Sequence, residues 1–141
     1  MTQEDKELLY KDLCARLPYG VKAQYMNNIF VIDYISSYEE VKLDTSYNWT
    51  VDVSEVKPYL FPISSITDEQ KSELNKKFNV QFSGNDIYSI HYHSEGCWDT
   101  DLELDLQDWL WFINWCYKNH FDINNLIEKG LAIDATGLNV Y

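Results

Sequence analysis

The spacing of apolar residues changes along the chain, and each change predicts a different element. Between residues 3 and 17, leucines recur close to the 3.6-residue period of a helix, and Pro18 and Gly20 then end it. From residue 20 to residue 63 the pattern becomes short runs of the residue types found in strands. These runs are residues 21–26, 29–35, 40–43 and 49–53.

We expect the four runs to pair as antiparallel strands. Asn27-Asn28 stands between the first two, and asparagine tolerates the positive φ of a tight hairpin turn. The segment 52–60 is expected to supply a single-turn helix and a closing strand. Residues 20–63 together predict a small SH3-like antiparallel barrel.

The second half of the chain predicts helices around a hairpin. Thr67-Asp-Glu-Gln70 matches a capping box and opens a helix that ends near Phe78. Residues 80–82 and 87–93 are expected to pair as a hairpin, and an aromatic helix should run from Leu106 to about His120. A last short helix is expected over 123–129, and the half-apolar tail 131–141 is expected to dock.

The buried face of the aromatic helix is predicted from the helical period. It should contain Leu106, Trp109, Leu110, Ile113, Cys116 and Tyr117. The simplest organisation is one α+β domain over residues 1–141, with a barrel-like part at 20–63 and a helix–hairpin–helix part at 64–141.

Composition narrows the classes of function. The 141 residues include 11 basic and 23 acidic ones, a net charge of −12, which opposes direct binding to nucleic acid or an anionic membrane. A basic partner fits that sign. With 45% hydrophobic residues the chain is too apolar to be disordered. Three cysteines and no apolar run of about 18 residues predict a cytoplasmic protein with reduced thiols.

The acidic residues are concentrated in one block. Residues 78–117 contain no Lys or Arg, and Asp99, Asp101, Glu103 and Asp105 alternate with other residues. On a strand these carboxylates would point to one side at about 6.6–6.8 Å intervals, a spacing that could mimic a nucleic-acid backbone and occupy a basic site on a host protein. Alternatively, the row is a solvated edge that prevents strand pairing.

Two tryptophans beside this row are candidates for partner binding. Trp111 and Trp115 lie one helical turn apart, off the face made by Trp109, Ile113 and Tyr117. They either pack under the domain's own barrel or form a contact surface, for which Trp is well suited. A homodimer through the aromatic helix is the corresponding self-association hypothesis.

His91, His93 and Cys97 are the cluster with metal-ligand residue types. Zinc needs three or four ligands in tetrahedral reach, and this spacing matches no established zinc pattern. We therefore expect no metal, no cofactor and no catalytic residue. The alternative is a metal-dependent or Cys/His enzyme that uses these three residues; otherwise the histidines are the polar face of an ordinary strand.

Three stretches carry a resemblance to known sequences. They are ELLYKDLCARLPYGV (Glu7–Val21), VKPYLFPISS (Val56–Ser65) and KNHFDINNLIEKGLA (Lys118–Ala132). These stretches resemble small uncharacterised proteins of bacteriophages and mobile elements from gut anaerobic bacteria. The resemblance covers most of the chain and implies an accessory role in an infected or lysogenic cell, but it brings no catalytic residue. The sequence thus predicts a non-enzymatic acidic interaction protein.

Overall fold

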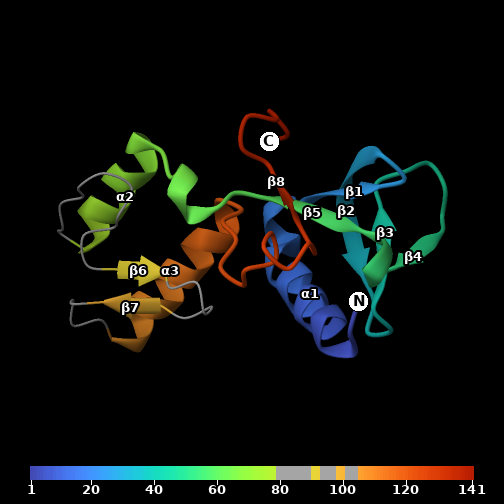
Figure 1. Cartoon of the computed structure of the whole chain (residues 1–141), viewed down its shortest axis with the longest axis horizontal. Coiled ribbons are helices and arrows are strands. Elements are labelled where there is room, and N and C mark those ends of the chain that lie inside the picture. Colours follow the sequence, from blue (N-terminus) through green and yellow to red (C-terminus); the bar gives the residue numbers. More distant parts are fainter. Residues whose placement is uncertain (79–89, 93–97, 101–104) are drawn as a thin grey trace.

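The helices and strands lie in two parts, shown in Figure 1. The computed structural model describes residues 1–78, 90–92, 98–100 and 105–141, with 90–92 and 98–100 described through their backbone alone. The helices are α1 (Gln3–Arg16), α2 (Asp68–Phe78) and α3 (Leu106–Lys118). The strands are β1 (Lys22–Tyr25), β2 (Asn28–Ile35), β3 (Glu40–Leu43), β4 (Thr50–Asp52), β5 (Lys57–Leu60), β6 (Ile90–Tyr92), β7 (Trp98–Thr100) and β8 (Ile133–Asp134).

The larger sheet has six strands in the order β4-β3-β2-β1-β5-β8. Neighbouring strands from β4 to β5 are antiparallel, whereas β8 is parallel to β5, with Tyr59 opposite Ile133. The helices and this mixed sheet confirm the α+β class.

The sheet is open, so the SH3-like antiparallel barrel is not confirmed. To close a barrel, β5 would have to pair with β1 along one edge and with β4 along the other. It does pair with β1, but its other edge is paired with β8. Because the distant segment that carries β8 occupies that edge, β5 cannot close the sheet against β4. Figure 1 shows β8 crossing between the sheet and the helical part.

Helix α1 covers the sheet because one of its faces is aliphatic. Its N-cap Thr2 accepts a hydrogen bond from the Asp5 amide at 3.1 Å, and it ends before Gly20, whose φ of 68° suits a residue without a side chain. Leu9 and Leu13 are fully buried in a core we call the sheet core. Its other buried members are Val21, Ala23, Ile32, Val41, Leu43, Val51, Val53, Val56, Leu60, Leu126, Leu131 and Ala132.

The first hairpin turns one residue earlier than expected. β1 ends at Tyr25 and β2 begins at Asn28, so Met26 and Asn27 form the turn, with φ of 46° and 60°. Positive φ at both central residues is the geometry that matches the twist of paired strands. The hairpin itself is therefore confirmed, and Met26 adopts a backbone conformation that methionine rarely takes.

The helical part has a separate core, which we call the aromatic core. It contains Ile66, Leu74, Phe112, Trp115, Cys116, Phe121 and Ile123. The capping box before α2 is confirmed, since Thr67 and Gln70 exchange side-chain-to-backbone hydrogen bonds. The α3 face predicted from the sequence is right only in part: Cys116 is buried and Trp109, Ile113 and Tyr117 pack against this core, but Leu106 and Leu110 are exposed by 72% and 50%. Phe112 and Trp115, which the predicted face left out, are buried as well, with Phe112 against Phe78 of α2 and Trp115 against Phe121.

The segment after α3 contains turns instead of the expected helix over 123–129. Asn125 has a φ of 60°, which interrupts the helical path, and the Asp122 carboxylate accepts the amides of Leu126 and Ile127. The tail docks as expected: Val140 and Ala135 are buried with Tyr59.

Some expectations lie outside the described residues. The expected strand at 80–82 and most of 87–93 belong to them, although β6 pairs with β7 antiparallel. No helix in the described part of the chain is long and apolar enough to span a bilayer.

Candidate interaction surface

The structure describes only the two ends of the acidic row. Asp99 lies in β7, directly opposite His91 of β6 in the strand register. Asp101 and Glu103 are outside the described residues. Asp105 is the N-cap of α3, where its carboxylate accepts the Asp108 amide at 2.8 Å. Whether these acids bind a partner stays a prediction.

The two candidate tryptophans have different surroundings. Trp115 is 5% exposed and lies against the rings of Phe112 and Phe121, as a core residue does. Trp111 is half-buried, and its ring is nearly parallel to that of Trp115, with centroids 6.3 Å apart. The Lys77 ammonium lies 5.4 Å from the Trp111 ring centroid, at the range of a cation–π contact.

A pocket of about 250 Å³ opens beside these rings. It is lined by Tyr19, Glu73, Trp111, Asn114, Trp115 and Lys118. We call it the tryptophan pocket. Tyr19 comes from the short 3-10 helix that follows α1 (Leu17–Tyr19), Glu73 from α2 and the others from α3, so segments far apart in sequence meet here.

A hydrogen bond to one of its two carboxylate oxygens holds the Glu73 side chain in this pocket. Its Oε2 accepts a hydrogen bond from Trp115 Nε1 at 2.9 Å. Among the described residues, Glu73 Oε1 has no hydrogen-bond partner and Lys118 has no ion pair. The pocket therefore presents an anchored carboxylate beside two stacked indoles, with a lysine at its border.

A second hollow, of about 270 Å³, lies between residues 62–64 and 122–128. Its carboxylates are already used by the fold. Asp122 accepts two backbone amides, and Glu128 accepts the Asn125 side chain at 2.8 Å. This hollow therefore has weaker binding chemistry than the tryptophan pocket.

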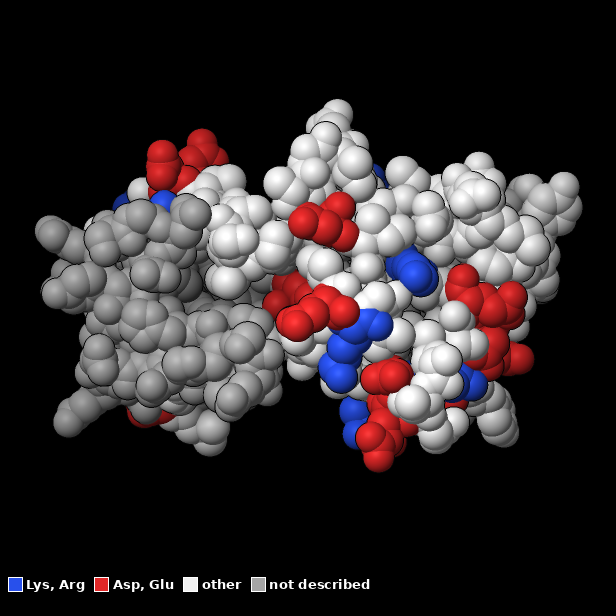
Figure 2. All heavy atoms as spheres, viewed as in Figure 1, with Lys and Arg blue, Asp and Glu red and all other residues white. Residues whose placement is uncertain are grey.

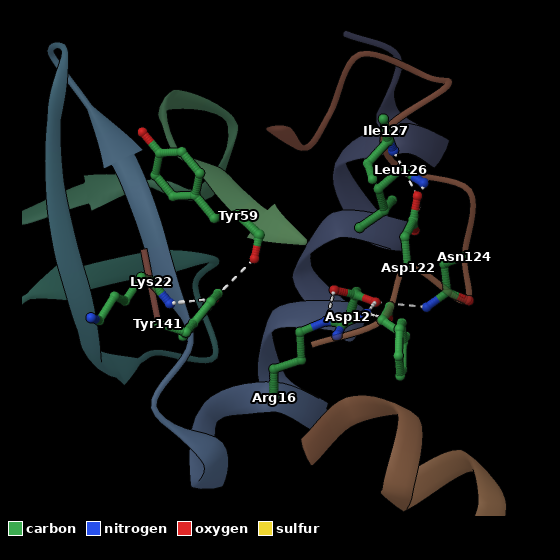
Figure 3. A network of polar contacts seen from close by, with 10 residues as sticks. Asp12, Arg16, Lys22, Tyr59, Asp122, Asn124, Leu126, Ile127 and Tyr141 are labelled. Atoms are coloured by element: carbon green, nitrogen blue, oxygen red, sulfur yellow. Dashed lines mark hydrogen bonds and ion pairs between the residues drawn. The ribbon is translucent and has the colours of Figure 1, made fainter. Parts of the chain in front are cut away.

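The two parts of the molecule are joined by a buried polar network, drawn in Figure 3. Arg16 and Asp12 are fully buried, with a distance of 2.6 Å between Arg16 Nε and Asp12 Oδ2. Arg16 also donates to the Phe121 carbonyl at 2.7 Å, and the Asn124 amide donates to Asp12 at 2.8 Å. The Arg16 guanidinium lies over the Tyr117 ring, 4.9 Å from the ring centroid.

His120 and Tyr141 extend this junction toward the sheet. Their rings stack with centroids 3.8 Å apart, and Tyr141 donates its hydroxyl to the Tyr59 carbonyl. Burial, with Arg16 and Lys22 nearby, lowers the pKa of His120 to about 4, and burial raises the pKa of Tyr141 to about 12. The same cause raises the pKa of Cys116, so this thiol stays protonated.

The sequence interpretation missed this network. The signal was present in part, because Asp12 and Arg16 are four residues apart and interleave with the buried Leu9 and Leu13. No local pattern pointed to Phe121 or Asn124 as partners.

The residues of the metal or enzyme alternative stay untested. His93 and Cys97 lie outside the described residues, and His91 is described through its backbone alone. Within the described ranges, no three His, Cys, Asp or Glu side chains are grouped so that they could hold a metal ion.

No family model, curated protein or solved structure matches the chain. The function must therefore be inferred from the chemistry of the surface itself.

Proposed function

We propose that the chain is a non-enzymatic acidic interaction protein that binds a basic polypeptide partner, as an accessory protein of phage or mobile-element origin would. The acidic row and the tryptophan pocket are the proposed contact regions. In this proposal the acidic row occupies a basic, nucleic-acid-binding site on a host protein.

One observation carries the proposal: the fold neutralises most of its own cations and leaves carboxylates in excess. Within the described residues, seven of the eleven basic side chains are paired with the chain's own acids at N–O distances of 2.6 to 3.9 Å. They are Lys6, Lys11, Arg16, Lys42, Lys71, Lys77 and Lys129.

The exposed carboxylates outnumber the remaining cations. Nine exposed acids have no ion pair among the described residues: Glu4, Glu40, Asp44, Glu55, Glu69, Glu73, Asp105, Glu128 and Asp134. In Figure 2, acidic side chains reach the surface over α1 and the adjoining strands, with lysines between them. A surface of this kind attracts a basic partner and repels nucleic acid and anionic lipid.

A short polyarginine peptide is a suitable probe, with binding followed by fluorescence anisotropy. In the test variant, Asp99, Asp101 and Asp105 become Asn and Glu103 becomes Gln. Asn keeps the N-cap at position 105, so α3 should be preserved. The control changes the exposed Glu4, Asp33, Glu40 and Glu69 to their amides, and both variants have a net charge of −12 + 4 = −8.

We expect the row variant to bind about tenfold or more weakly and the control to lose much less. Binding should also weaken between 0.1 and 1 M salt, as the Debye length falls from about 10 Å to about 3 Å. Equal losses in both variants would mean that the row is not the contact region. Failure of the parent to bind the peptide at all would overturn the proposed function.

Two alternatives give different results in simple measurements. Stoichiometric zinc in the purified protein, lost in His93→Ala, would favour the metal or enzyme hypothesis. A dimer in light scattering that dissociates in Leu106→Gln or Leu110→Gln would favour self-association, because both leucines are exposed on α3.

A further inference from the structure

The tryptophan pocket has the chemistry of a cation site. We infer that it receives an arginine side chain of the basic partner, an inference that rests on the proposed function. The guanidinium would lie against Trp111 and donate hydrogen bonds to Glu73.

The position of Glu73 favours a cation. Its carboxylate is held beside the indoles by the hydrogen bond from Trp115 Nε1, so little side-chain freedom remains to be lost on binding. Oε1 remains as an acceptor among the described contacts. A cation bound between a carboxylate and an aromatic face gains two interactions. The carboxylate attracts it by charge, and the ring attracts it through its quadrupole.

Lys77 provides an example within the fold itself. Its ammonium lies over the Trp111 ring, 5.4 Å from the centroid, while the same group is 3.9 Å from Asp108. Trp111 therefore already takes part in a cation–π contact whose charge is balanced by a nearby carboxylate. Glu73 offers the same combination at the pocket.

The size of the pocket favours a single side chain. About 250 Å³ lies below the roughly 300–1,000 Å³ of pockets that hold drug-sized ligands. Arginine suits it better than lysine, because a planar guanidinium can stack on an indole and donate to a carboxylate at the same time. Lys118 lies on the lining, so it should oppose a cationic occupant and assist an anionic one.

The test uses the full-length protein with the polyarginine peptide and a polylysine peptide of equal length. Affinity is measured by anisotropy, and the Trp115 indole N–H resonance is followed by NMR. Glu73→Gln keeps an oxygen that can accept from Trp115 Nε1, and thermal unfolding checks that the variant is folded. Glu69→Gln is the matched control, because it removes an equal charge one turn away on α2, outside the pocket lining.

We expect Glu73→Gln to weaken polyarginine binding by about 10- to 100-fold, while Glu69→Gln changes it little. Lys118→Ala should tighten binding by about two- to fivefold. The Trp115 indole resonance should shift on titration of the parent protein. Polyarginine should bind more tightly than polylysine.

Three results would overturn the inference while leaving the proposed function intact, provided that the parent binds polyarginine. They are equal losses in Glu73→Gln and Glu69→Gln, weaker binding in Lys118→Ala, and equal affinity for the two peptides. The second result would indicate an anionic occupant. If the parent binds neither peptide, the proposed function and this inference fail together.

Discussion

The sheet part and the helical part of this protein are stabilised by different kinds of side chain. The sheet core is made of Leu, Val, Ile and Ala, with α1 laid over the strands. The aromatic core depends on large rings, with Phe112, Trp115 and Phe121 in mutual contact. A few aromatic residues bury as much area as many small ones, so two helices and the segment that follows α3 can together form a core.

The same difference affects what each part can offer to a partner. The buried residues of the sheet core are all aliphatic, so they contribute packing and carry no side-chain hydrogen-bonding group. In the helical part, a tryptophan that is buried still donates its indole N–H to Glu73. Aromatic cores thus combine burial with polar contacts at their border, and the tryptophan pocket is one result.

The largest expected effect comes from breaking the junction between the two parts. Asp12→Ala would leave the Arg16 guanidinium buried without its carboxylate, so the free energy of unfolding should fall by about 3–5 kcal/mol. Urea unfolding measures this. Glu7→Ala is the matched control, because it removes the exposed i,i+4 pair with Lys11 on the same helix and should change little.

Asp12→Ala also tests whether the parts unfold together. Three of the five tryptophans lie on α3, so fluorescence reports mainly on the helical part, whereas far-UV circular dichroism reports on the whole chain. We expect coincident transitions in the parent and separate ones in the variant. Coincident transitions with unchanged stability in Asp12→Ala would show that the junction does not couple the parts.

A comparable effect is expected from truncating each core in turn. Trp115→Ala should lower the free energy of unfolding by about 3–5 kcal/mol and Leu13→Ala by about 2–5 kcal/mol, since both side chains are buried. Thermal and urea unfolding give both values. Trp115→Phe keeps an aromatic ring but removes the hydrogen bond to Glu73. If its free energy of unfolding falls nearly as far as that of Trp115→Ala, the hydrogen bond, and not the packing, provides most of the stabilisation.

A smaller effect, at the junction, depends on pH. Because the pKa of His120 is lowered from 6.5 to about 4, the unfolded chain takes up a proton first as the pH falls. The stabilisation is therefore complete above about pH 6.5 and is lost as the pH falls toward 4. We expect a loss of about 1–2 kcal/mol, reduced from the full shift by solvent screening.

His120→Asn checks this assignment, because asparagine does not titrate and tolerates the φ of 60° at this position. The loss between pH 6.5 and 4 should disappear in the variant. Asp52 does not contribute to this pH-dependent loss. Its pKa is lowered to about 2, mainly by the hydrogen bond from Lys6, so the stability that it provides is lost at lower pH. An unchanged pH profile in His120→Asn would remove His120 as the cause.

The sequence singled out two of the residues that line the tryptophan pocket, but neither the pocket itself nor its chemistry. Trp111 and Trp115 stood out from composition and helical spacing. Glu73 did not, because it is 42 residues from Trp115 and nothing local connects them. The acidic row was visible at once, although only Asp99 and Asp105 fall within described residues.

The sequence by itself determined the local features of the protein. It placed α1, the capped start of α2, the strands from β1 to β4 and the excess of carboxylates, because periodicity, caps and turn residues act between near neighbours. The tertiary structure decided which face of α3 is buried, the parallel pairing of β8 with β5, and the partners of Arg16. These depend on which distant segments meet, and many surfaces of similar hydrophobicity could have met instead.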